Sequence, residues 1–90
     1  MAKIIKSATL NGRRYRIDFD HGLDGWCDQY EMNDRYISIL AKPFTRNELI
    51  TVLHELLHAE DWTKGEEPID RISREIGKAM WGLGFRRSDV

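Results

Sequence analysis

The first half of the chain alternates hydrophobic and polar residues with the period of a β-strand. Residues 14–20 alternate charged and hydrophobic side chains, as a strand with one buried face does. Asn11-Gly12 precedes this run, and the dipeptide favours a type I′ hairpin turn because both positions accept positive φ. Residues 35–41 are β-rich and alternate again. We predict a three- or four-stranded antiparallel sheet over about residues 3–41.

The second half has the period of two helices. Thr45-Arg46-Asn47-Glu48 is a capping box, which predicts a helix over about residues 46–63. We expect a second helix over about residues 66–83, ended by Gly84. The first helix has a broad apolar face made of Leu49, Val52, Leu53, Leu56 and Leu57. The second has a core stripe made of Ile69, Ile72, Ile76, Met80 and Leu83. The prediction is one α+β domain over residues 1–90, with the sheet packed on the two helices.

Composition and charge exclude several classes of partner. The chain has 90 residues and a net charge of −1, which gives no general attraction to nucleic acid or to an anionic membrane. The short basic clusters at residues 13–16 and 86–87 are expected to be solvated surface. No apolar run reaches the length of a membrane span, and we expect no secretion signal at the start. A single cysteine, Cys27, suits the reducing cytoplasm.

One motif indicates chemistry: His54-Glu55-Leu56-Leu57-His58, an HExxH sequence on the first predicted helix. Residues four apart lie one turn apart on the same helix face, so His54 and His58 can bind one Zn²⁺. Glu55 follows at about 100° around the helix, beside the metal, where a carboxylate can take a proton from the water that zinc activates. The motif therefore predicts a zinc site in which Glu55 is the general base.

A catalytic zinc site needs a third protein ligand and one open position. No histidine follows His58, so an acidic residue is the expected ligand. We favour Glu66, with Asp70 one turn further on as the hydrogen-bonding partner of a ligating histidine. The sequence also leaves open Asp70 itself, Glu67, Asp61 and Cys27 as the third ligand.

The chain also resembles small HExxH proteins of phage and bacterial genomes that are described as zinc metallopeptidases. The resemblance covers about residues 22–85 and rests on five segments: Gly25-Trp26-Cys27-Asp28, His54-Glu55-Leu56-Leu57-His58-Ala59, Trp62, Glu66-Glu67-Pro68-Ile69-Asp70, and Met80-Trp81-Gly82-Leu83-Gly84-Phe85. It implies a minimal zincin-like fold, in which a sheet lies over the active-site helix and the next helix supplies an acid. The chain is more loosely similar to SprT-like proteases, but it has no histidine where they have the third ligand.

Together these features predict a cytoplasmic, zinc-dependent peptidase that acts on a peptide or protein substrate. Tyr36–Ala41 could pair with an extended peptide if that strand lies at an edge of the sheet. The competing hypothesis is a non-catalytic domain that zinc stabilises, or a partner-binding protein. The two differ in whether the fourth metal position is open or is filled by a side chain.

Overall fold

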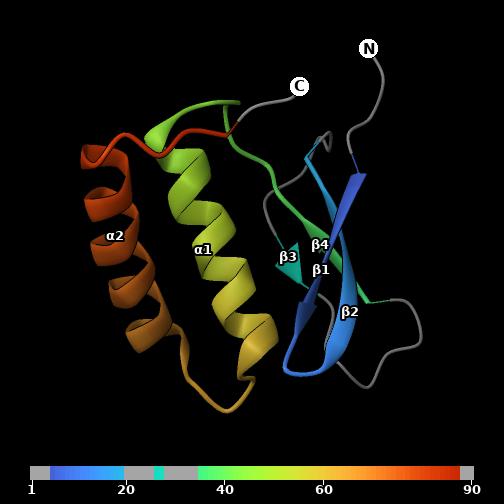
Figure 1. The fold of residues 1–90 in the computed structure, drawn as a ribbon. Helices are drawn as coiled ribbons and strands as arrows, with labels where there is room; N and C mark the ends of the chain where they lie inside the picture. Colours follow the sequence, from blue (N-terminus) through green and yellow to red (C-terminus); the bar gives the residue numbers. More distant parts are fainter. Residues whose placement is uncertain (1–4, 20–25, 28–34, 88–90) are drawn as a thin grey trace.

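The computed structural model describes residues 5–19, 26–27 and 35–87, which form a sheet beside two antiparallel helices (Figure 1). This is the α+β class that the sequence predicts. In chain order the elements are β1 (Ile5–Leu10), β2 (Arg13–Asp18), β3 (Trp26–Cys27), β4 (Tyr36–Ser38), α1 (Arg46–Glu60) and α2 (Glu66–Gly82). Within these described residues, no helix is long and apolar enough to cross a membrane.

The predicted hairpin is confirmed. β1 and β2 pair antiparallel with Leu10 opposite Arg13, which leaves a two-residue turn. Asn11 and Gly12 have φ values of 50° and 74°, the left-handed conformation that a type I′ turn requires at both positions. The carboxylate of Glu60, at the end of α1, accepts a hydrogen bond of 2.6 Å from the backbone N–H of Asn11. The hairpin tip is therefore attached to the last turn of α1.

The sheet is mixed, whereas we expected all strands to be antiparallel. The strand order is β1-β2-β4-β3, and β2 pairs parallel with β4, with Ile17 opposite Ile37. A two-residue period shows which side chains share a face but not the direction of the neighbouring strand, so the pattern could not reveal this pairing. β4 lies between β2 and β3. The edge position that Tyr36–Ala41 would need in order to pair with a peptide is therefore not available at β4.

The core lies between the sheet and α1, because α1 packs on the sheet and α2 packs on the other side of α1 (Figure 1). The buried hydrophobic cluster consists of Tyr15, Ile17, Ile37, Ile39 and Ala59, with Val52 and Leu56 packed against it. The apolar face predicted for α1 is only half-buried, and the most buried positions of this helix are Glu48, Glu55 and Ala59. A helix with neighbours on both sides spreads its burial around its circumference instead of concentrating it on one stripe.

The packing face of α2 is rotated from the stripe that the sequence suggests. Ile69, Ser73 and Gly77 are its buried residues, while Ile76 and Leu83 are exposed. These buried positions recur every four residues, and two of the three are small. Small side chains allow the backbones of α1 and α2 to approach closely, so hydrophobic residues beside them are left at the surface.

Local hydrogen bonds fix both ends of α1. The Thr45 hydroxyl accepts the backbone N–H of Glu48 at 3.1 Å, which confirms the predicted helix start. α1 ends at Glu60, three residues before the predicted limit, because the Asp61 carboxylate accepts the backbone N–H of Thr63 at 2.9 Å and holds a turn. The hydroxyl of Thr63 donates a hydrogen bond to the same carboxylate. The hydrogen bonds from the hydroxyl and the backbone N–H of Thr63 lower the pKa of Asp61.

The end of α2 is a Schellman motif, as the glycine in the sequence suggests. Gly84 has a φ of 96° and donates its N–H to the carbonyl of Trp81 at 3.0 Å. The N–H of Phe85 donates to the carbonyl of Met80 at 3.1 Å. The chain is thereby turned back over the start of α1.

Candidate metal centre

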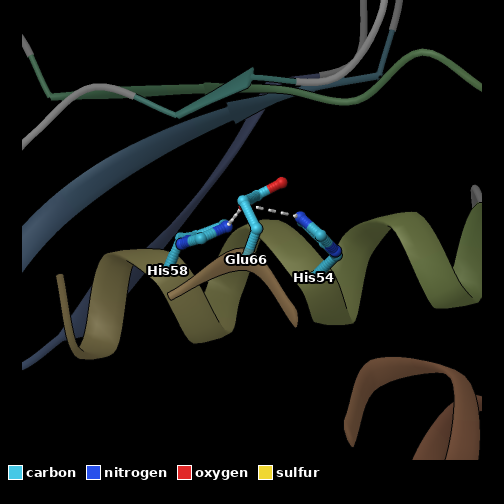
Figure 2. Close-up of side chains that lie close together, drawn as sticks. All are labelled: His54, His58 and Glu66. Carbon is cyan, nitrogen blue, oxygen red and sulfur yellow. Dashed lines mark hydrogen bonds and ion pairs between the residues drawn. The ribbon is translucent and has the colours of Figure 1, made fainter. Parts of the chain in front are cut away.

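His54 and His58 lie one turn apart on α1, and their side chains point into the same space (Figure 2). The ring centroids are 4.8 Å apart in an edge-on arrangement. The side chains are 20% and 13% exposed, so the rings are held by their surroundings but open to solvent on one side. This is the arrangement that the four-residue spacing predicts for two ligands of one ion.

Glu66 completes the group from the first position of α2. Figure 2 shows its carboxylate between the two imidazoles. Oε1 of Glu66 lies 3.4 Å from Nε2 of His54 and forms a hydrogen bond with Nε2 of His58. The three donor atoms all lie within 4.8 Å of one another, so this group could hold a metal ion. The structure thus brings together the three residues that the sequence favours as ligands.

Asp70 lies on the other side of His54, one turn beyond Glu66. Its Oδ1 atom is 3.9 Å from Nδ1 of His54, whereas Glu66 approaches Nε2 of the same ring. The Oδ2 atom of Asp70 accepts a hydrogen bond of 3.0 Å from Nε of Arg74. Asp70 therefore lies on the Nδ1 side of the His54 ring, too far for a hydrogen bond, and does not share the Nε2 side with Glu66.

Neither Glu67 nor Asp61 joins this group in the described part of the chain. Glu67 is exposed and stands outside the three-residue cluster. The carboxylate of Asp61 accepts hydrogen bonds from the backbone and the hydroxyl of Thr63. Cys27, the remaining candidate for the third ligand, belongs to β3, and its side chain lies outside the description.

Glu55 is buried beside the histidines, and its pKa is raised. Burial is the main cause because it penalises the charged carboxylate; Glu66 raises the pKa further, and His54 opposes the shift. Glu55 and His54 line a groove of about 310 Å³. A carboxyl group that is shielded from bulk water but borders a groove is suited to exchanging a proton with a molecule bound there.

The groove extends along α1 from His54 toward the start of that helix. Its lining is mostly polar: Leu40, Asn47, Ile50, Thr51, His54, Glu55, Asp70 and Arg74. We did not predict Asn47 and Thr51 as groove residues. Thr51 follows Asn47 by four positions and precedes His54 by three, which places all three on one helix face, and this spacing was the available signal.

The indole ring of Trp62 packs against the imidazole ring of His58. The two rings are stacked, with centroids 5.8 Å apart and an interplanar angle of 27°. Trp62 is half-buried in this position beside His58. The contact limits the rotation of the His58 ring and so helps to hold its Nε2 atom toward Glu66.

Comparison of the chain with protein-family models, with curated proteins and with solved structures finds no match. The case for a function therefore rests on the geometry of the group formed by His54, His58 and Glu66 and on the groove beside it.

Proposed function

We propose that the protein is a zinc-dependent hydrolase of peptide bonds. The observation that supports this proposal is the convergence of His54, His58 and Glu66 from two helices, with the buried carboxyl group of Glu55 in the adjoining groove. Two imidazole nitrogens and one carboxylate oxygen form a donor set typical of catalytic zinc, and such a set leaves a further position for a small ligand.

The exposure of the donors agrees with an accessible site. The Glu66 side chain is 76% exposed, whereas both histidines are mostly covered. A structural zinc site is normally closed by four protein ligands, and the described residues gather three around this point. When bound, zinc would polarise a substrate carbonyl and lower the pKa of water.

The residues of the chain would divide the remaining work. His54, His58 and Glu66 would hold the ion, while Asp70, 3.9 Å from Nδ1 of His54, would move within hydrogen-bonding distance of that ring when the ion is bound. Glu55 accepts the proton of the attacking water at its carboxylate and returns it to the leaving amine. The raised pKa of Glu55 favours this role, because a more basic carboxylate holds a proton better.

A peptide substrate would lie in the polar groove and could extend along the sheet. Among the described strands, β3 lies at the edge next to β4, and it contacts α1. We place an added strand on the outer side of β3. We place this activity in the cytoplasm, where a chain with one cysteine needs no disulfide.

The first test is the metal content of protein purified without added zinc, measured beside H54A. We expect about one zinc per chain in the wild type and little in H54A. Cleavage of a mixed peptide library by the zinc-loaded protein is then compared with E55Q, which we expect to bind zinc without cleaving. A wild-type protein that binds no zinc even when it is supplied would refute the proposal.

A second candidate function is supported by the position of the ligands on both sides of the turn between α1 and α2. An ion held by His58 and Glu66 would join the two helices and could stabilise this small fold without catalysis. Zinc that raises the melting temperature, combined with no cleavage of any peptide in the library, would favour this candidate.

A further inference from the structure

A second pocket is lined by residues from the start of α1 and the end of α2. Figure 1 shows that these two helix ends lie together, at the opposite end of the helix pair from the start of α2, which carries Glu66. Its volume is about 270 Å³. The walls are mainly hydrophobic and include Phe19, Phe44, Leu49, Val52, Met80, Trp81 and Phe85. It shares no lining residue with the groove beside His54, so the proposed peptidase activity leaves it without a role.

Arg87 closes one side of this pocket and neutralises its only acidic lining residue. Nε and Nη2 of Arg87 donate hydrogen bonds of 2.9 and 3.0 Å to the two carboxylate oxygens of Glu48. The Glu48 side chain is 4% exposed, and the guanidinium of Arg87 also stacks on the rings of Phe19 and Phe44. We expected residues 86–87 to be solvated, which is wrong for Arg87, because its partner Glu48 lies 39 positions away in the chain.

The surroundings of the pocket are positively charged. Glu48 and Arg87 neutralise each other, and the other charged residues in the segments 42–49 and 80–87 are all cations: Lys42, Arg46 and Arg86. All three are exposed. The first turn of α1 adds backbone N–H groups and the positive end of the helix dipole. The start of α1 and the segment after α2 therefore carry a local excess of positive charge, although the whole chain has a net charge of −1.

Two aromatic residues that line the pocket are left partly in water. Phe44 is 48% exposed and Phe85 is 57% exposed. Phe44 also has a φ of 62°, which is unfavourable for a residue with a side chain. An exposed aromatic side chain held by a strained backbone is a feature of binding sites rather than of inert surface.

We propose that this pocket binds a partner peptide in which one large apolar side chain is flanked by carboxylates. The pocket is slightly smaller than the usual 300–1,000 Å³ of sites for small molecules and cofactors, and it suits one or two buried side chains. The apolar side chain enters between Phe44 and Phe85, and the flanking carboxylates face Lys42, Arg46 and Arg86.

The test is a titration of ¹⁵N-labelled protein with the peptide acetyl-Glu-Asp-Phe-Asp-Glu-amide, followed by NMR. We expect the amide signals of residues 44–49 and 81–87 to shift, while those of residues 54–66 stay in place. A control peptide with lysine at the four acidic positions should bind at least tenfold more weakly. Added salt should weaken the binding of the acidic peptide, because it screens the attraction between opposite charges.

F44G separates binding from folding. Glycine accepts the φ of 62° and keeps the N–H that Phe44 donates to Glu48 at 3.2 Å, so the variant should fold while its affinity falls about tenfold or more. L83S is the matched control, because Leu83 is 78% exposed but does not line the pocket, and its affinity should be unchanged.

The proposal is overturned if neither peptide shifts residues 44–49 and 81–87, if both peptides bind equally, or if F44G binds as the wild type does. Two further results would also overturn it in favour of another occupant. Shifts of the same signals with protein concentration alone would indicate a second copy of this chain. Shifts with decanoate but with no peptide would indicate a fatty acid.

Discussion

Gly77 of α2 lies so close to Ile50 of α1 that a Cβ atom at this position would stand 2.6 Å from Cγ1 and 3.4 Å from Cα of the isoleucine. Contacts as short as the first are not tolerated between carbon atoms. Gly77 is therefore the point that sets how closely the two helices pack. This spacing matters for the metal centre, because α1 supplies two of its donors and α2 the third.

G77A should destabilise the protein by about 1–3 kcal/mol, as overpacking in a well-packed interior does. The higher helix propensity of alanine, worth about 1 kcal/mol, offsets only part of this. G82A is the control, because nothing lies within 4 Å of an added Cβ there, and it should be neutral or slightly stabilising. Urea denaturation of both variants measures the difference. Equal free energies of unfolding for G77A and the wild type would show that α1 and α2 can move apart to accept a Cβ atom without loss of stability.

E66Q should lose metal affinity, and E67Q should not. The two residues are neighbours at the exposed start of α2, but only Glu66 reaches the histidines. Loss of a charged ligand should lower the zinc affinity by more than the roughly 10–100-fold that follows loss of a side chain hydrogen-bonded to a ligand. Competition with a fluorescent zinc chelator gives both affinities. If E67Q weakened zinc binding as much as E66Q, the assignment of the third ligand would be wrong.

E55Q should stabilise the metal-free protein at neutral pH. Because folding raises the pKa of Glu55, the stability contributed by its neutral form is fully present at acid pH and is lost as the pH rises through the raised pKa. The amide of E55Q stays neutral throughout. Thermal unfolding in a chelator should therefore show E55Q melting a few degrees above the wild type at pH 7, with the two converging below about pH 4. The opposite trend would mean that the carboxylate form of Glu55 stabilises the fold.

D70N should weaken zinc binding about 10–100-fold while the fold is preserved. The charged carboxylate of Asp70 lies near Nδ1 of His54 and stabilises a ring whose Nε2 atom faces the ion. E75Q is the matched control, because Glu75 accepts a similar hydrogen bond from Arg71 on the same helix, away from the site. Isothermal titration with zinc compares the two variants. An unchanged zinc affinity in D70N would show that Asp70 does not act on His54 and serves only as the hydrogen-bond partner of Arg74.

Much of the fold follows from local sequence signals. The hairpin at Asn11-Gly12, the cap at Thr45 and the end of α2 at Gly84 each depend on a few neighbouring residues, and all three are confirmed. The parallel pairing of β2 with β4 could not be predicted, because it is set by the path of the chain between them. The burial of α2 through Ser73 and Gly77 also escaped prediction, since it depends on the shape of α1.

The candidate site shows the same division. His54, Glu55 and His58 lie on one helix, so spacing alone fixes their relation. Glu66 could only be favoured over Glu67 and Asp70, because its approach depends on how the turn at residues 61–65 closes. The ion pair of Glu48 with Arg87 had no local signal at all, since Glu48 lies in the first turn of α1 and Arg87 follows the end of α2.

That ion pair also bears on how the protein is made. A chain emerges from the ribosome with its amino end first, and domains generally fold as units. Glu48 can be placed in its buried position only at considerable cost while its cation is missing. The start of α1 must therefore wait for Arg87, which is synthesised 39 residues later. We expect the start of α1 to reach its native packing only after the segment containing Arg87 has been released.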